Sequence, residues 1–130
     1  MDIEKVNVAV GLAAISEHWR PHIVGEANGS KIQLAKLKGE FVWHSHEGSE
    51  DVFLVLRGRL EVDLPDQTII LDEGDLLVVP RGVEHRPRAD EEVHVLNIEL
   101  MGTVNTGDAE EAGVLTAPEQ YLSVSDGQTK

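Results

Sequence analysis

The stretch from Trp43 to Gly58 constrains the fold of this chain more than any other. It begins Trp-His-Ser-His, continues through an acidic pair, and ends in an apolar β-type run that stops at Gly58. Alternate residues of a β-strand point to the same face, so His44 and His46 project together. Two imidazoles at one strand end, with a carboxylate from across a turn, can hold one cation. Such ligands suit Fe, Mn, Ni or Zn.

A second segment, from Gly74 to His85, carries another histidine. Its apolar run Leu-Leu-Val-Val ends at Pro80-Arg81-Gly82, which is a turn signal. His85 follows three residues after the glycine. The sequence therefore indicates two separate β segments, each of which supplies histidine beside a turn.

Together the two segments resemble the signature motifs of the cupin family, G-x5-HxH-x3,4-E-x6-G and G-x5-PxG-x2-H-x3-N. The first is matched from His44 to Gly58 and the second from Gly74 to His85. The resemblance covers roughly residues 39–98. It implies a double-stranded β-helix, which is a jelly-roll barrel, with a metal at its centre. The implied ligands are His44, His46, His85 and one carboxylate.

The sequence departs from these motifs at three positions. Only four residues separate Gly39 from His44, where the motif has five, and Ala89 stands at the asparagine position. Neither position is a ligand. The third departure concerns the carboxylate: Asp51 is in register with the motif glutamate, while the longer Glu50 comes one residue earlier. Neighbouring strand residues face opposite sides, so one of the two serves. We favour Asp51 and keep Glu50 as the alternative.

Composition narrows the class of protein. The chain has 130 residues, a formal net charge of −13 and no cysteine. This length predicts a single domain with its own core. The negative charge argues against nucleic acid and membrane surfaces as partners, because both require a basic face. Without cysteine, a metal would have histidine and carboxylate ligands. No apolar run is long enough to span a membrane and no signal peptide is visible, so we expect a cytoplasmic protein.

Short apolar or alternating runs, separated by turn residues, predict an all-β fold. They occupy residues 23–25, 31–37, 40–46, 52–56, 59–64, 68–71, 76–79 and 93–100. Strands this short and regularly spaced are typical of a sandwich or barrel, here with a barrel core of about 23–100. Apolar spacing from Val6 to Ile15, with Asn7 as a cap, predicts a short N-terminal helix. Residues 101–130 form a polar and acidic C-terminal extension.

The segment 40–46 also bears on oligomeric state. If His44 and His46 point inward, strand alternation places Phe41 and Trp43 outward, with Ser45, while Glu40 and Val42 face in. An exposed Phe and Trp on a barrel strand are unusual in a monomer. Either another layer of the chain covers them or they form a dimer interface. The family resemblance implies pairing through sheets, so we expect a homodimer.

Several further residues are candidates for substrate contact. Phe53 and Val55 share a strand face with Asp51 and are expected to line the cavity. Arg81 and Arg86 flank His85 in an otherwise acidic chain. They suit an anionic oxygen at the cavity mouth, or else pair with acids at the surface. His94 is either a donor near the metal or a partly exposed strand residue.

The resemblance implies one divalent transition metal per chain (Fe, Mn, Ni or Zn) and a small-molecule ligand, but it names no substrate. The barrel hosts many functions, and chains of this type are often labelled mannose-6-phosphate isomerase-like on the fold alone. We expect a metal-dependent enzyme on a small organic substrate, anionic if the arginines line the cavity. It would act as a dioxygenase or as an isomerase or epimerase. The alternative is a non-catalytic small-molecule or sugar-binding cupin with a structural metal.

Overall fold

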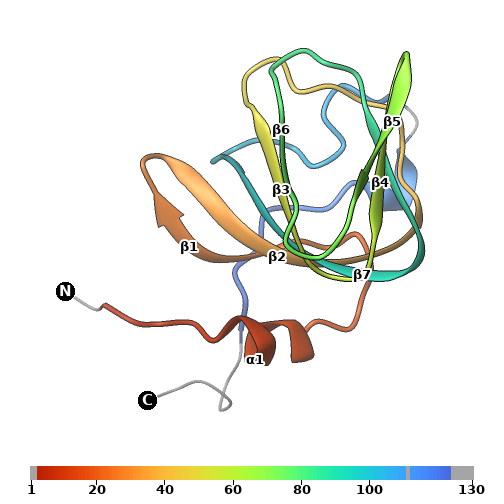
Figure 1. Cartoon of the computed structure of the whole chain (residues 1–130). Helices are drawn as coiled ribbons and strands as arrows, with labels where there is room; N and C mark the ends of the chain where they lie inside the picture. Colours follow the sequence, from red (N-terminus) through yellow and green to blue (C-terminus); the bar gives the residue numbers. More distant parts are fainter. Residues whose placement is uncertain (1–2, 111, 124–130) are drawn as a thin grey trace.

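The computed structural model describes residues 3–110 and 112–123, and it confirms the all-β prediction (Figure 1). The seven strands form antiparallel pairs. The elements in chain order are α1 (Val8–Ala13), β1 (His22–Ala27), β2 (Ser30–Glu40), β3 (Asp51–Arg57), β4 (Leu60–Leu64), β5 (Gln67–Leu71), β6 (Leu76–Val79), β7 (Arg86–Leu100) and the 3-10 turn η1 (Gly113–Leu115). Residue 111 and residues 124–130 of the predicted C-terminal extension, 101–130, lie outside the described residues.

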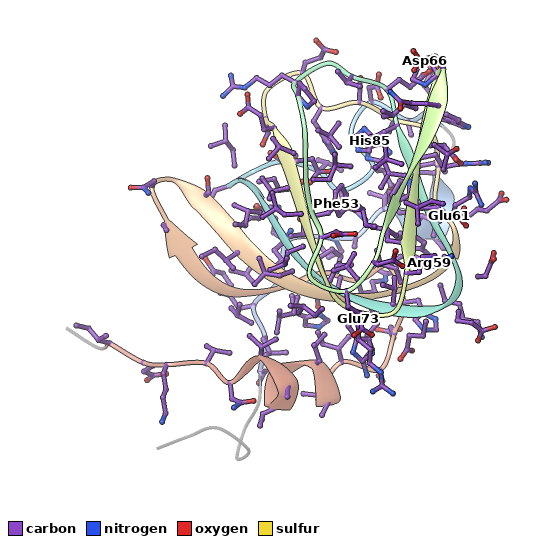
Figure 2. All side chains as sticks on the ribbon, in the orientation of Figure 1. Phe53, Arg59, Glu61, Asp66, Glu73 and His85 are labelled. Carbon is purple, nitrogen blue, oxygen red and sulfur yellow. The ribbon has the colours of Figure 1, made fainter. Side chains whose placement is uncertain are left out.

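The long strand β7 connects the two halves of the barrel. The main sheet has the order β1-β2-β7-β3-β6, while β4 pairs with both β5 and β7. The start of β7 pairs with β4, and its later part pairs with β3. Figure 2 shows Phe53 and His85 inside the ring of strands. The charged side chains of Arg59, Glu61, Asp66 and Glu73 lie at its periphery.

The core lies between the inward faces of β2, β3, β4 and β7. Its buried members include Leu37, Phe53, Val55, Leu60, Val62, Val93 and Val95. A smaller cluster lies outside the barrel, where Leu12 and Ile15 pack on Leu34 of β2. The backbone N–H of Val10 donates to the Asn7 side chain at 3.0 Å, which confirms the predicted helix cap.

The strand predicted over residues 40–46 is wrong. β2 ends at Glu40, and the chain then runs irregularly with only a single bridge from His44 to His85. Phe41 is buried and stacks on Trp19 with ring centroids 4.6 Å apart, so it does not face outward. Trp43 is 39% exposed, with the Arg86 guanidinium over its ring. Strict alternation fails because the chain leaves the hydrogen-bonded ladder, after a bulge between Leu37 and Gly39.

The outer face of β3, β6 and β7 is apolar and open beyond α1. Leu96, Leu54 and Leu76 are cross-strand neighbours on this face. The adjoining row joins Ile98, Val52 and Val78. Leu76 is 60% exposed and Val78 48%. We call these six residues the outer apolar face. Among the described residues, no helix is long and apolar enough to cross a membrane.

Candidate metal centre

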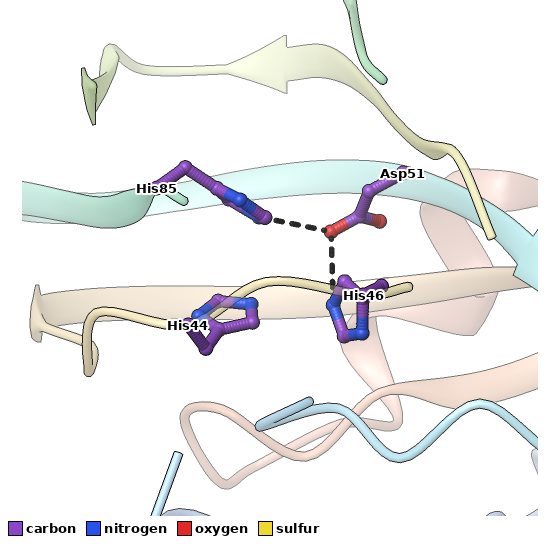
Figure 3. A group of neighbouring side chains, drawn as sticks. All are labelled: His44, His46, Asp51 and His85. Carbon is purple, nitrogen blue, oxygen red and sulfur yellow. Dashed lines mark hydrogen bonds and ion pairs between the residues drawn. The ribbon is translucent and has the colours of Figure 1, made fainter. Parts of the chain in front are cut away.

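Four buried side chains from separate parts of the chain converge inside the barrel: His44, His46, Asp51 and His85 (Figure 3). One ligating atom from each lies within 4.8 Å of those of the other three. Asp51 Oδ2 is 3.6 Å from His46 Nε2 and 3.4 Å from His85 Nε2. The folding of the barrel therefore brings both histidine motifs and one acid to a single point.

Backbone hydrogen bonds fix the two motifs against each other. The N–H of His44 donates to the carbonyl of His85 at 3.0 Å, and the N–H of His85 returns the bond at 2.9 Å. The N–H of Gly82, in the Pro-x-Gly turn, donates to the carbonyl of His46 at 2.9 Å. Asp51 begins β3 opposite Val79, the last residue of β6. All four donors thus stand on backbone held by several neighbours.

The ring orientation of two histidines is set by backbone carbonyls. His44 Nδ1 lies 2.9 Å from the carbonyl oxygen of Val42, and His85 Nδ1 lies 2.9 Å from that of Val83. A carbonyl only accepts, so each Nδ1 carries the proton. In the neutral ring this leaves Nε2 with a lone pair, which is the ligating form of imidazole.

Burial adjusts the charges of the cluster. It lowers the pKa of His44 to about 4, and the nearby His85 acts in the same direction. For Asp51, burial opposes ionisation, but the close His46 and His85 side chains prevail and hold its pKa below the usual range. Near neutral pH the cluster therefore contains an ionised carboxylate facing at least one neutral imidazole.

The donor set fits a bound cation. His46 Nε2 is buried and has no hydrogen-bond partner among the described residues. A carboxylate oxygen that faces imidazole lone pairs is unfavourable unless a positive charge lies between them. Three imidazoles and a carboxylate suit a divalent transition metal. The cluster could therefore hold a metal ion with four protein ligands.

The second oxygen of Asp51 accepts a hydrogen bond from one side-chain amide, which is itself held by another. Asn97 Nδ2 donates to Asp51 Oδ1 at 2.6 Å, and Gln33 Nε2 donates to Asn97 Oδ1 at 2.9 Å. These bonds leave Oδ2 facing the imidazoles. Our sequence analysis missed both amides. Strand alternation could have identified them. Gln33 in β2 and Asn97 in β7 alternate with the outward-facing residues of their strands, so both side chains point inward.

The structure places Glu50 away from the cluster. The side chain of Glu50 is 52% exposed and lies 3.3 Å from Arg81 Nε. Asp51, which is 4% exposed, occupies the position that register predicted. Neighbouring residues at the start of β3 face opposite sides, so only one of them reaches the imidazoles.

A cavity adjoins the cluster on the side of His44 and Asp51. Its free volume is about 50 Å³. The lining comprises Trp19, Pro21, Ala35, Leu37, Phe41, His44, Asp51, Phe53, Pro87, Val95, Asn97, Glu99 and Asn105. Phe53 thus lines the cavity, as expected. Val55 is fully buried but packs in the core without lining it.

The remaining candidates for substrate contact lie elsewhere. Arg81 pairs with Glu50, and Arg86 lies 2.9 Å from Asp63 and 3.3 Å from Glu40. Surface pairing, the second alternative for both arginines, is therefore what the structure shows. His94 points to the outer face of β7, where its Nε2 lies 3.0 Å from Glu92.

Comparison with known proteins agrees with this geometry. The family model described as "Cupin domain" matches residues 31–99, which include all four clustered residues. The chain belongs to the cupin family. This cupin is 39% identical over 67 residues to the uncharacterized protein YdbB of Bacillus subtilis (strain 168). The match covers 51% of this chain and 59% of the length of that relative.

Solved structures agree with the jelly-roll barrel. A cupin-2 domain containing protein from Shewanella frigidimarina NCIMB 400 is 39% identical, with a TM-score of 0.72 over 73% of this cupin and 93% of that chain. Protein NMB1881 from Neisseria meningitidis is 38% identical, with a TM-score of 0.69 over 75% of this cupin and 99% of that chain. Hydroquinone 1,2-dioxygenase from Sphingomonas sp. TTNP3 is 20% identical, with a TM-score of 0.64 over 79% and 80%, and shares the fold alone.

Proposed function

We propose that this cupin binds one divalent transition metal per chain through His44, His46, Asp51 and His85. We further propose that it is a metal-dependent enzyme acting on a small organic substrate. The observation that carries this proposal is the buried, unpartnered His46 Nε2 within a cluster of four converging donors. The cluster borders a cavity, so a substrate has a place beside the ion.

A metal held by His44, His46, Asp51 and His85 would supply Lewis acidity toward a substrate oxygen, or a site for oxygen activation. The chain supplies the surroundings. Trp19, Phe41 and Phe53 form an apolar wall of the cavity. Four protein ligands leave two positions free on a six-coordinate ion, whereas they would close a tetrahedral zinc site.

Glu99 supports an isomerase- or epimerase-type reaction. Its side chain is 4% exposed and lines the cavity. Burial, together with the charge of Asp51, raises the pKa of Glu99 to about 9. Lys31 lies 3.7 Å away, but its closer partner is Glu119 at 2.8 Å. Glu99 is therefore a protonated carboxyl group near neutral pH, able to give a proton to a bound substrate. Dioxygenase-type chemistry is the second candidate.

Metal analysis after purification without chelators tests the binding step. The wild-type protein is expected to contain about one Fe, Mn, Ni or Zn ion per chain, and His85→Ala to lose most of it, because one of four ligands is removed. His94→Ala is the matched control, since that histidine lies on the outer face of the barrel. Full metal content in the His85 variant would contradict the proposed ligand set.

The reaction type is tested with the metal-loaded protein. Exchange of substrate hydrogens with deuterated solvent, over a panel of hydroxyketones, is expected for an isomerase and is expected to fall sharply in Glu99→Gln. Oxygen consumption with enols and diketones would instead support the dioxygenase. A metal-loaded protein that binds these compounds with neither signal would support the non-catalytic binding cupin.

We also propose that this cupin forms a homodimer through the outer apolar face. The expectation began from Phe41 and Trp43, but Phe41 is buried in the core. Leu76 and Val78, exposed side by side on β6, now support it. A contiguous exposed apolar surface on a sheet favours association.

A further inference from the structure

The walls of the cavity beside the metal cluster are unequal in polarity. Trp19, Leu37, Phe41, Phe53 and Val95 make its apolar part. Its polar part consists of His44, Asp51, Asn97, Glu99 and Asn105. Within residues 3–110 and 112–123, no lysine or arginine lines it. The chain therefore offers a bound molecule both apolar contact and oxygen and nitrogen atoms.

Trp19 is held firmly in the apolar wall. Its ring lies 4.6 Å from that of Phe41 at an interplanar angle of 21°, and its Nε1–H donates to the carbonyl of Lys38 at 2.8 Å. The backbone of Trp19 has a φ of 62°. This left-handed conformation is rare for a bulky residue and is kept where the surroundings over-determine it. The indole is thus a fixed part of the cavity wall.

The cations nearest the barrel interior already have partners. Lys31, the buried lysine of β2, donates to Glu119 and to the carbonyl of Thr103, each at 2.8 Å. Arg86 and Arg88 both donate to Asp63. An anionic ligand in the cavity would therefore meet only the metal as a positive charge, with the Asp51 carboxylate beside it. Burial of a charge that lacks a partner is costly.

The polar lining also selects what can bind. The Asn105 side chain donates to the carbonyl of Leu115 and accepts from the N–H of Ala117. The Asn97 side chain donates to Asp51 and accepts from Gln33. Glu99 lines the cavity beside Asp51, so the described lining presents two carboxyl groups and no lysine or arginine. Such a lining, next to a metal site, favours a neutral oxygen acceptor, such as a hydroxyl or carbonyl group, over an anion.

We propose that this cavity takes a small uncharged molecule that carries a hydroxyl or carbonyl oxygen. Its apolar part lies against Trp19, Phe41 and Phe53, and its oxygen faces His44 and Glu99. Carboxylates and phosphates are selected against. The free volume of about 50 Å³ holds about four water molecules, so the ligand is small. The assignment rests on the proposed function for the metal beside that oxygen.

The test uses fluorescence of Trp19. The chain has two tryptophans, so Trp43→Phe leaves Trp19 as the single tryptophan in the full-length protein. Isobutyramide and isobutyrate serve as probes, because they match in shape and differ in charge. In manganese-loaded protein, where a six-coordinate ion would keep two positions free, we expect isobutyramide to change the emission of Trp19 saturably. Isobutyrate is expected to bind at least about tenfold more weakly than isobutyramide, because binding would bury its negative charge.

Two variants in the Trp43→Phe background locate the probe. Ala35→Val narrows the cavity and is expected to weaken isobutyramide binding at least several-fold. Ala89→Val adds the same atoms to the core away from the cavity and is expected to leave binding unchanged. Circular dichroism verifies that both variants fold. If one fails to fold, the comparison of the two probes in the Trp43→Phe protein decides.

The outcomes separate this inference from the proposed function. Equal or tighter binding of isobutyrate in manganese-loaded protein, or no response of Trp19 to isobutyramide, would overturn the inference while the metal site stands. If the protein takes up no metal, the proposed function fails, and the metal-free protein then decides the inference. If the metal-free protein prefers isobutyramide over isobutyrate, the result supports a cavity for neutral ligands. If it shows no such preference, the inference is rejected.

Discussion

Two amide side chains determine which oxygen of Asp51 faces the histidines. Asn97 donates to Oδ1 of Asp51 at 2.6 Å and is itself held by Gln33. In Asn97→Leu this oxygen and the Gln33 amide lose their partner inside the barrel. We expect metal affinity to fall about 10- to 100-fold and the free energy of unfolding to fall by about 1–3 kcal/mol.

A chelator competition titration measures the first effect and urea denaturation the second. His94→Ala, on the same strand but the opposite face, is expected to change neither value appreciably. An Asn97→Leu protein that binds metal as tightly as the wild type would show that Asp51 needs no orientation by the amide.

Gly107 lies where no side chain fits. A Cβ atom at this position would stand 2.3 Å from the carbonyl oxygen of Ser45 and 3.1 Å from His46 Nδ1. We therefore expect Gly107→Ala to displace the segment that carries His46 and to reduce both metal affinity and melting temperature. The control is Gly102→Ala, which also has a positive φ but would meet nothing within 4 Å. Equal losses in the two variants, measured by thermal unfolding and metal titration, would assign the effect to backbone strain alone.

Site residues that belong to a sequence motif were predicted correctly. Site residues that stand out only as polar positions on a strand were not. Register predicted Asp51, which joins the imidazoles, over Glu50. Gln33, Asn97 and Glu99 were not anticipated. Polar residues on a strand are normally placed toward solvent, and the partners that allow their burial come from other strands. That pairing exists only once the barrel has closed.

At the scale of elements, β4 and β7 are joined by charge as well as by backbone. Asp63 on β4 accepts hydrogen bonds from Arg88 at 2.7 Å and Arg86 at 2.9 Å, and from Thr68 at 2.6 Å. Arg88 in particular holds the pKa of Asp63 below its ordinary value of 3.8. The ion pairs are therefore fully formed above that value, and their stabilisation is lost as the pH falls through the lower pKa of the folded state.

We expect Asp63→Asn to lower the melting temperature at pH 7 and to reduce the loss of stability between about pH 5 and pH 2, because the titrating group is gone. Melting curves across this range measure both. Asp66→Asn, at the exposed β4–β5 turn, is the control and is expected to follow the wild type. An unchanged acid dependence in Asp63→Asn would assign it to other carboxylates.

The irregular segment after β2 shows where element prediction fails. Alternation within residues 40–46 placed the correct histidines together but put Phe41 on the wrong side. The chain departs from β2 after a bulge and is then held by isolated bonds, such as that from the N–H of Phe41 to the carbonyl of Pro87. Phe41 keeps the inward phase of Leu37, and the histidines turn inward only after the chain has left the ladder, a change that an apolar pattern does not reveal.

For the whole molecule, turn spacing and strand length were enough to predict an all-β barrel. The homodimer was predicted from Phe41, which is buried, and Trp43, which is 39% exposed, because exposure depends on which layer covers a side chain. The outer apolar face is a second argument for this proposal. We expect analytical ultracentrifugation to give a species of about twice the 14.3 kDa chain mass.

Leu76→Lys combined with Val78→Lys is expected to give the monomer, since charge at these exposed positions opposes burial. The control is Val114→Lys, because this side chain is 83% exposed and does not belong to the outer apolar face. It is expected to leave the dimer intact. A wild-type protein that sediments as a monomer at micromolar concentration, or a dimer insensitive to both lysines, would contradict pairing through this face.

The backbone carbonyls of Val42 and Val83 have a consequence for how the protein loads its ion. They hold the Nδ1 protons of His44 and His85, so Nε2 is the nitrogen left for the ion in each ring, and His44, whose pKa burial lowers to about 4, has no proton to shed from it near neutral pH. Asp51 is ionised beforehand. Loading near neutral pH should therefore acidify an unbuffered solution very little, in contrast with thiol sites, which exchange protons for metal. A pH indicator in a weakly buffered titration would register the difference.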